Sequence, residues 1–152
     1  MRRSERACDT PEFIEAMFRQ TDVMTVSFHH DGFPYAVPVN FVHHEGCLYF
    51  HCATEGQKLD CMKRDSRVAF SMFTVIAIDK EKATTRYRSL LGTGQAELVE
   101  NAEEKRAALA ALAEKYDSRC TLPVPDKMLA ATGVVRIRIV SLTGKRNDPP
   151  AN

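Results

Sequence analysis

The stretch that decides the fold runs from Pro34 to Val68 and reads PYAVPVNFVHHEGCLYFHCATEGQKLDCMKRDSRV. Its two apolar segments, Pro34–His43 and Cys47–Cys52, are rich in β-branched and aromatic residues and are typical of strands. Glu45-Gly46 between them is a hairpin turn signal. The stretch therefore predicts two antiparallel strands, and the polar segment that follows them predicts a short helix.

A two-residue turn at Glu45-Gly46 sets the register of this hairpin. The predicted opposite pairs are His44 with Cys47, Val42 with Tyr49, and Asn40 with His51. Side chains alternate between the two faces of a strand. One face is therefore predicted to join the core through Val39, Phe41, Leu48, Phe50 and Cys52. The other is predicted to be a polar and aromatic surface leading to the helix start, with Asn40, Val42, His44, Cys47, Tyr49 and His51.

The helix start after Ala53 is predicted to bind an anion. Thr54 and Gln57 have the spacing of a capping box, with Thr54 as the N-cap residue. The first turn of a helix presents unpaired backbone N–H groups and a partial positive charge, and both attract anions. Lys58 adds a full positive charge at the same place. The sequence therefore predicts an anionic ligand where the hairpin runs into this helix.

Composition excludes several classes of function. The chain has 152 residues and a net charge of +1 with interspersed charges, so neither nucleic acid nor an anionic membrane is an expected partner. No apolar run approaches the roughly 20 residues of a membrane span, and none follows the basic N-terminus as in a secretion signal. We expect a cytoplasmic protein with a single domain over residues 1–146 and a disordered tail at 147–152.

The five cysteines are odd in number and irregularly spaced, which indicates reduced thiols rather than a disulfide framework. A metal site is not expected, because the neighbouring histidines and cysteines split between opposite faces of the hairpin and no second ligand pair follows. A cysteine nucleophile is not indicated either, since the sequence suggests no histidine partner for Cys52 or Cys61.

The rest of the chain predicts two more helices and four more strands. Thr10-Pro11 predicts a helix over Pro11–Gln20, and Asn101 predicts the start of an alanine-rich helix over Ala102–Tyr116. The remaining elements are strands at Val23–His29, Arg67–Ile78, Thr85–Val99 and Val134–Leu142, and a loop at Asp117–Lys127. Six strands without a repeating strand–helix unit favour a mainly β fold, an antiparallel barrel with flanking helices.

The order of these features resembles that of a known superfamily. Its first motifs are Gly32-x-Pro34-x-x-x-Pro38-Val39-x-Phe41, Leu48-Tyr49-Phe50-His51-x-Ala53, Gly56-x-Lys58-Leu59-Asp60 and Arg67-Val68-Ala69-Phe70. The later ones are Tyr87-Arg88-Ser89-x-x-x-x-Gly94-x-Ala96-Glu97 and Ile139-x-x-Leu142-Thr143-Gly144-Lys145. Together they resemble the FMN-binding split-barrel superfamily, and within it the pyridoxamine 5′-phosphate oxidase-related proteins of the 5-nitroimidazole-resistance (Nim-type) branch.

The resemblance implies a six-stranded antiparallel split β-barrel that forms a homodimer and binds FMN at the subunit interface. It implies backbone contacts to the flavin ring from the strand that carries Val37, Pro38, Val39 and Asn40. Beside the ring and ribityl chain it implies His51, Cys52 and Ala53, and at the phosphate it implies Gln57, Lys58 and Leu59. Arg88 and Ser89 match positions that approach the flavin from the barrel strands. His51 matches a histidine beside the flavin and is the candidate catalytic residue.

The implied function is that of an FMN-dependent oxidoreductase, nitroreductase-like, acting on an unidentified small molecule. The oxidases carry arginine where this chain has Gln57, and their substrate-binding C-terminal segment has no counterpart after Lys145, so pyridoxamine phosphate is not the expected substrate. Two alternatives stay open. One is a split-barrel module that binds flavin or haem without turnover, and the other is a relative that binds a deazaflavin.

Overall fold

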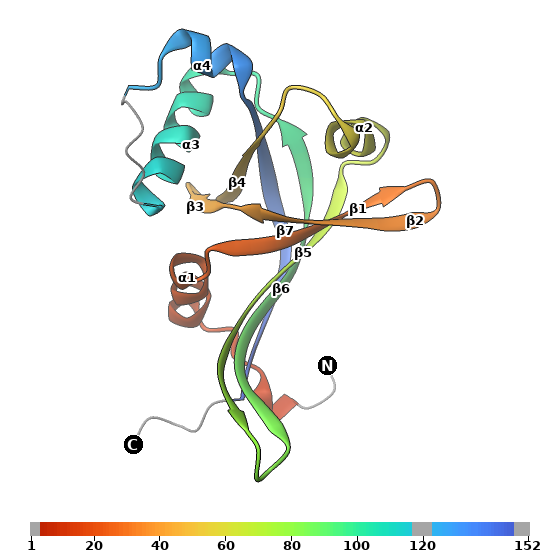
Figure 1. The fold of residues 1–152 in the computed structure, drawn as a ribbon, viewed down its shortest axis with the longest axis vertical. Coiled ribbons are helices and arrows are strands. Elements are labelled where there is room, and N and C mark those ends of the chain that lie inside the picture. Colours follow the sequence, from red (N-terminus) through yellow and green to blue (C-terminus); the bar gives the residue numbers. More distant parts are fainter. Residues whose placement is uncertain (1–3, 117–122, 148–152) are drawn as a thin grey trace.

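The computed structural model describes residues 4–116 and 123–147, which form one seven-stranded sheet with helices packed around it (Figure 1). A short 3₁₀ turn at Ser4–Arg6 precedes the main elements. In chain order these are α1 (Pro11–Gln20), β1 (Val23–His30), β2 (Phe33–Asn40), β3 (Val42–His44), β4 (Cys47–Cys52), α2 (Gln57–Arg64), β5 (Arg67–Asp79), β6 (Thr84–Leu98), α3 (Ala102–Lys115), α4 (Asp126–Ala131) and β7 (Gly133–Arg146).

The strand order shows that the sheet is curled. Neighbouring strands follow the order β2-β1-β5-β6-β7-β4-β3, and every neighbouring pair is antiparallel. β2 and β3 lie at opposite edges of this order, yet only Phe41 separates them in the chain. The ends of the two edges that this single residue joins must meet in space, so the sheet curls into a half-barrel, which is consistent with a split barrel. The predicted mainly β architecture with flanking helices is confirmed.

The sheet has seven strands rather than six because the predicted strand Pro34–His43 is broken at Phe41. Before Phe41 the chain pairs with β1, and after it the chain pairs with β4. The backbone N–H of Phe41 donates a hydrogen bond to the Tyr116 hydroxyl at 2.9 Å. A side chain of α3's C-terminal end therefore supports the residue at which the chain changes its partner strand.

The predicted hairpin register is confirmed next to its turn. Glu45 and Gly46 have φ values of 48° and 76°, as a type I′ turn requires. The paired residues are His44 with Cys47 and Val42 with Tyr49. The predicted pairing of Asn40 with His51 is wrong, because the break at Phe41 leaves Asn40 paired with Val23 of β1.

Part of the hairpin face that was predicted to be polar is buried, in addition to the predicted core face. Leu48 and Phe50 are fully buried in the main core between the sheet and the helices α1 and α2, as expected. Val42 and Tyr49 on the opposite face are also buried, in a second cluster with Ala108 and Leu112 of α3 and with Val99 and Val134. The prediction of a polar surface is therefore wrong for Val42 and Tyr49, which α3 covers, whereas Asn40 and His51 of the same predicted face are exposed.

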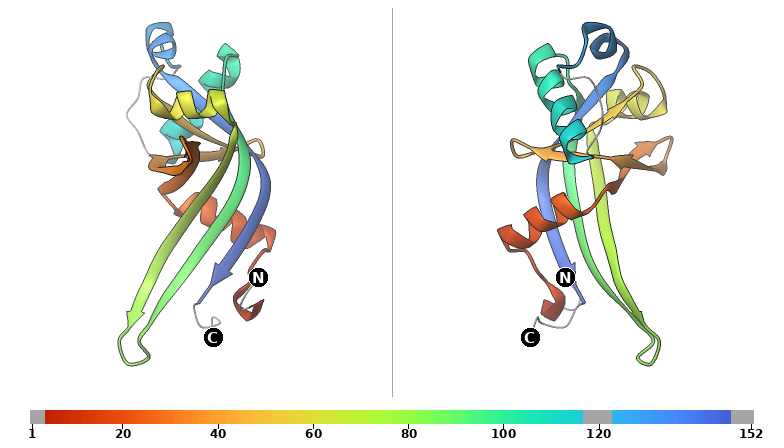
Figure 2. Two further views of the ribbon diagram at one scale, coloured as in Figure 1. Left: turned by 90° about the vertical axis from the view of Figure 1, so that its right-hand side faces the viewer. Right: turned by 60° about the vertical axis from the view of Figure 1, so that its left-hand side comes forward.

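The two longest helices begin where their caps predict. The Thr10 hydroxyl accepts the N–H of Phe13 at 3.3 Å, and the Asn101 side chain accepts the N–H groups of Glu103 and Glu104 at 2.9 Å. α4 was not predicted and begins inside the expected loop Asp117–Lys127, whose residues 117–122 lie outside the described part. α3 and α4 gather at one end of the sheet, and the β5–β6 hairpin projects from the other end (Figure 2).

Three expectations concern the chain as a whole. Of the predicted tail 147–152, only Asn147 lies within the described residues, and its N–H donates to the Tyr87 carbonyl at 2.8 Å. The four described cysteines are free thiols, and Cys120 lies outside the described residues. Among the helices of the described ranges, none is long and apolar enough to cross a membrane.

Candidate functional site

A groove where β2, β4 and α2 meet collects the central part of the predicted site. Its volume is about 430 Å³, and its lining residues are Val23, Pro38, Val39, Asn40, His51, Cys52 and Lys58. Small-molecule sites have volumes of roughly 300–1,000 Å³, so the groove is large enough for a ligand of moderate size. The curl of the sheet is what brings the end of β2 next to the end of β4.

Other predicted residues border the groove or belong to the core. The side chain of Val37 is half-buried against the main core, and that of Leu59 is fully part of it. Ala53 and Gln57 are exposed between the end of β4 and the first turn of α2. From these positions, their backbone groups and the exposed side-chain amide of Gln57 can contribute to the groove.

Arg88 and Ser89 lie away from the groove in this chain. Both are on β6, where they pair with Thr74 and Phe73 of β5. Neither is among the residues that line the groove. A single chain therefore does not bring the two parts of the predicted site together.

β2 presents backbone groups to the groove because it is an edge strand. Among the described strands its ladder partner is β1 alone, with Asn40 opposite Val23 and Pro38 opposite Thr25. The N–H and C=O groups on the other side of an edge strand are not used by the sheet and can bond to a ligand. The geometry is therefore suited to the backbone contacts predicted for this strand.

The start of α2 differs from the prediction. Its N-cap residue is Gly56, and no side chain of the described ranges caps this end, so the predicted capping box of Thr54 and Gln57 is wrong. Gly56 has a φ of 123°, which glycine adopts without the strain that other residues meet. The helix consequently begins at Gln57, which is its first residue and not its third.

The uncapped start leaves an anion site more open than the predicted one. The carbonyl of Gly56 accepts the N–H groups of Leu59 and Asp60 at 2.9 and 3.2 Å. The N–H groups of Gln57 and Lys58 precede these, at positions where a helix offers no internal acceptor. With the Lys58 ammonium beside them, they form a donor set for a phosphate or carboxylate.

A second lysine lies near the same place. Burial raises the pKa of the Cys52 thiol, and the positive charges of Lys58 and Lys105 oppose that rise. Cys52 is therefore a neutral thiol at neutral pH, while both lysines add positive potential near the groove. Lys105 was not predicted, because it lies on α3 and only the packing of that helix on the sheet brings it close.

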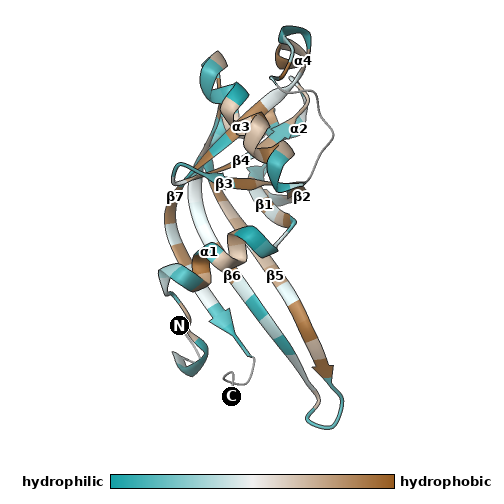
Figure 3. Ribbon diagram, turned by 90° about the vertical axis from the view of Figure 1, so that its left-hand side faces the viewer, coloured by the Kyte–Doolittle hydropathy of each residue, from teal (hydrophilic) through white to brown (hydrophobic). Residues whose placement is uncertain are grey.

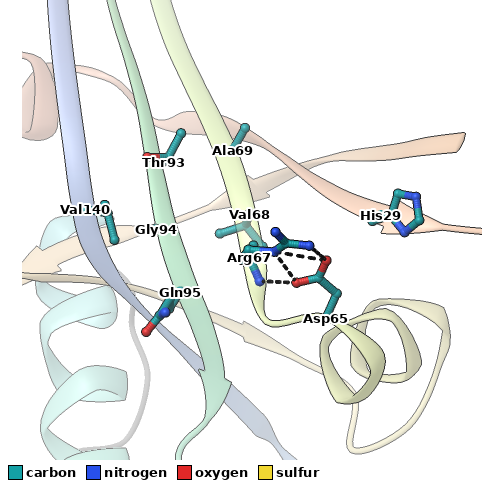
Figure 4. A pocket seen from close by; sticks show the side chains of 9 residues that line it. All are labelled: His29, Asp65, Arg67, Val68, Ala69, Thr93, Gly94, Gln95 and Val140. Atoms are coloured by element: carbon teal, nitrogen blue, oxygen red, sulfur yellow. Dashed lines mark hydrogen bonds and ion pairs between the residues drawn. The ribbon is translucent and has the colours of Figure 1, made fainter. Parts of the chain in front are cut away.

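A larger cavity, of about 600 Å³, lies on the outer face of β5, β6 and β7 and was not predicted (Figure 4). Its best-defined feature is the ion pair of Asp65 and Arg67. The carboxylate accepts hydrogen bonds from Arg67 Nε at 2.9 Å and Nη2 at 2.7 Å, and from the backbone N–H at 3.0 Å. These bonds hold the pKa of the Asp65 carboxyl well below its usual range.

The outer cavity continues along the sheet into a shallow hollow of about 340 Å³, and the two share Ala69 and Thr93. Most of the residues that line this hollow are small, and the hydroxyls of Thr93 and Ser141 lie 2.7 Å apart in it. Two exposed apolar side chains, Leu91 and Val140, lie along the same surface. The hollow is therefore apolar and hydroxyl-rich, and the cavity beside it carries the Asp65–Arg67 ion pair.

The structure also gives Cys61 a histidine neighbour that the sequence did not indicate. Its sulfur lies 3.6 Å from His30 Nδ1. Cys61 is only 1% exposed, and burial raises the pKa of its thiol, so the contact joins a neutral thiol to the ring inside the fold. No group of three metal-ligating side chains occurs in the described ranges.

A comparison of the sequence with models of protein families shows the family of this chain. The model described as pyridoxamine 5′-phosphate oxidase matches residues 10–146, which include all seven strands and the groove. The chain belongs to the pyridoxamine 5′-phosphate oxidase family. The family resemblance read from the motifs is thereby confirmed. No protein of curated function matches the sequence at a significant level.

Solved structures of this oxidase family and its neighbours have the same fold. A candidate 5-nitroimidazole antibiotic resistance protein of Bacteroides thetaiotaomicron is 26% identical, with 91% of this chain and 85% of that one covered and a TM-score of 0.82. A flavocytochrome of Azotobacter vinelandii is 21% identical over 99% and 73% of the two chains, with a TM-score of 0.82. An FAD- and haem-binding protein of Mycobacterium smegmatis is 22% identical over 97% and 76%, with a TM-score of 0.80.

Proposed function

We propose that the protein is an FMN-binding oxidoreductase that acts on a small molecule, with the flavin held between two copies of the chain. The observation that carries this proposal is the groove itself. It combines an edge strand with free backbone groups, the uncapped start of α2, and Lys58 beside that start. An anion with a large planar ring has complementary partners at both ends of such a groove.

The residues present fit FMN. The phosphate would take the N–H groups of Gln57 and Lys58 together with the Lys58 ammonium, and Lys105 would add charge from α3. The ring would lie along Pro38, Val39 and Asn40 with the end of β4 beside it. When bound, the flavin supplies the electron transfer, and the protein supplies orientation and charge.

His51 is the side chain of the groove best suited to contact a substrate. It is exposed near the end of β4, where its backbone pairs with Val134 of β7. An imidazole can donate or accept a hydrogen bond. We assign it the role of orienting the substrate, with a nitroaromatic compound as the substrate class suggested by the 26% identical relative.

A second copy would complete the site. Arg88 and Ser89 are too far along β6 to line the groove of their own chain, and they would reach the flavin only from a partner. The far half of β5 exposes apolar side chains that a partner would cover, among them Phe73 and Ile78 at 65% and 70% exposure. The proposal is therefore a homodimer with two flavin sites at its interface.

The first experiment is a titration of the purified protein with FMN, followed by absorbance and by native mass. Lys58→Ala is expected to weaken FMN binding by about 1.5–3 kcal/mol, the range for hydrogen bonds to charged groups. Lys63→Ala is the matched control, because Lys63 lies in the last turn of the same helix with its side chain 76% exposed. Equal FMN affinity in the two variants would contradict the phosphate assignment.

A module that binds flavin, haem or a deazaflavin without turnover is the alternative. Two of the similar structures are named for flavin together with a haem group, which favours keeping this candidate. Oxidation of a reduced nicotinamide in the presence of a nitroaromatic acceptor distinguishes the enzyme from the module. The absorption spectrum of the loaded protein distinguishes FMN from haem and from a deazaflavin.

A further inference from the structure

The wall of the groove ends at a corner where the chain leaves β2 and enters β3. Asn40 is the last residue of β2, and Phe41 is the single residue between the two strands. On the other side of the same wall, Val23 begins β1 directly after Asp22. The Asn40 side chain donates a hydrogen bond to the Asp22 carbonyl at 3.2 Å, so the two chain segments meet at this point.

Tyr116, directly after α3, occupies the centre of this corner. Its hydroxyl accepts the Phe41 N–H at 2.9 Å. The same oxygen lies 2.6 Å from the Asp22 carbonyl and 2.9 Å from the Phe41 carbonyl, either of which can accept its single proton. One hydroxyl therefore contacts the backbone at both the end of β2 and the start of β1. It does so at Phe41, which lies between two strands and belongs to neither.

Lys115, the last residue of α3, holds the neighbouring segment. Its ammonium donates to the carbonyls of Phe18 and Thr21 at 2.9 Å each, and it lies 3.7 Å from the centre of the Phe41 ring. These carbonyls belong to the C-terminal end of α1, which leads into β1. The same ammonium thus joins the entry to β1 to the corner residue.

We propose that Lys115 and Tyr116 are positioning residues for the ligand groove. They do not line the groove but hold the backbone next to its lining residues in the geometry that binds the ligand. This inference rests on the proposed flavin site and adds a part of the chain that does not touch the ligand. Every backbone group that they contact lies within two residues of Val23 or Asn40, except the carbonyl of Phe18. Both Val23 and Asn40 line the groove.

The physical reason is pre-organisation. Phe41 is fully buried, so its N–H needs a partner, and without the Tyr116 hydroxyl the corner must move to find one. A corner that moves changes the distance between the end of β2 and the end of β4. A ligand then binds only the fraction of molecules with the correct spacing, and the apparent affinity falls by that fraction.

The experiment compares two tyrosine variants, each of which removes one hydroxyl at an end of α3. Tyr116→Phe removes the bonds at the corner, whereas Tyr49→Phe removes a bond to Glu104 in the first turn of the same helix. Hydrogen exchange of the flavin-free proteins is followed in the peptides that contain Val23 and Val37–Asn40, and FMN affinity is measured separately. Lys115→Met and Lys115→Arg form a second pair, the latter keeping the charge and the donors.

We expect Tyr116→Phe and Lys115→Met to speed exchange in both groove peptides and to weaken FMN about three- to ten-fold, the effect of one hydrogen bond. Tyr49→Phe should change neither the exchange rates nor the FMN affinity. Lys115→Arg should keep both close to those of the unchanged protein. Equal exchange at the groove in Tyr116→Phe and Tyr49→Phe would overturn the inference. If the unchanged protein binds no flavin, the proposed function fails, and the exchange data alone decide the positioning role. If Tyr116→Phe does not fold, the Lys115 pair decides it.

Discussion

The long β5–β6 ladder has two halves that are alike in pairing and opposite in burial. Its pairs run from Arg67 with Gln95 to Asp79 with Thr84, with one irregularity between Val75 and Ala77. In the half nearer the helices, Val68, Phe70 and Met72 are at most 5% exposed, and exposed residues alternate with them. In the far half this alternation stops, and large apolar side chains are exposed on successive residues. Those at least 47% exposed are Phe73, Val75, Ile76 and Ile78.

The comparison shows that backbone pairing and burial have separate causes. Pairing needs only the neighbouring strand, whereas burial needs a layer that covers the face. α1, α2 and the curl of the sheet cover the near half, while the far half extends past them (Figure 3). Apolar side chains nevertheless continue to the end of β5. Exposed apolar patches of this kind mark interaction surfaces, which agrees with the proposed homodimer.

The largest expected effect comes from the covered half. Phe70→Ala removes a fully buried ring that packs against Gly92 of β6, and it should lower the free energy of unfolding by about 3–5 kcal/mol. Chemical denaturation measures this change. Phe73→Ala is the control on the open half of the same strand and should change the stability of the monomer by about 0.5 kcal/mol or less. Similar losses in both variants, measured at protein concentrations where the chain is monomeric, would mean that the far half is covered within one chain.

A smaller effect is expected at the interface between copies. The double variant Phe73→Asp and Ile78→Asp places two charges on the far half of β5, where a partner would have to desolvate them. It should shift the protein from dimer to monomer in sedimentation experiments and should weaken FMN binding, while the far-UV circular dichroism stays unchanged. A variant that remains dimeric would place the interface elsewhere on the barrel.

The smallest expected effect is on the pH dependence of stability, through Tyr49 of β4, which α3 covers. Burial, together with the hydrogen bond from the Tyr49 hydroxyl to Glu104, raises the pKa of Tyr49 to about 12. The folded state thus holds this proton more tightly than the unfolded state. Its contribution to stability is complete below the ordinary value of 10 and is lost as the pH rises towards 12. Tyr49→Phe should remove that part of the pH dependence in thermal unfolding between pH 9 and 12, whereas Tyr87→Phe should keep it.

Local features of this protein were predictable because their causes lie within a few residues. Thr10 and Asn101 cap helices through bonds to N–H groups two or three positions ahead. The Glu45-Gly46 turn determines the nearest pairs of the hairpin and with them the core face of Leu48 and Phe50. The family resemblance added the candidate site residues, and six of these twelve line the groove.

Other features depend on contacts between distant segments, and the sequence alone did not show them. Tyr49 became buried because α3 packs over it, and the same packing brings the charge of Lys105 close enough to influence Cys52. At the strand break, the N–H of Phe41 bonds to the hydroxyl of Tyr116, 75 residues away. Alternation of side chains says which residues share a face, and only the packed layers decide which of the two faces is covered.

By itself the sequence determined the helices with strong caps, the hairpin, the family and the candidate phosphate lysine, because each depends on short-range bonding or on a linear motif. The tertiary structure alone decided that the two edges of the sheet meet at Phe41, and that α2 begins at Gly56 with its first N–H groups open. It also decided that one half of β5 is covered and the other is not. The physical reason is that burial and closure depend on which surfaces meet, and that requires all elements to be in place.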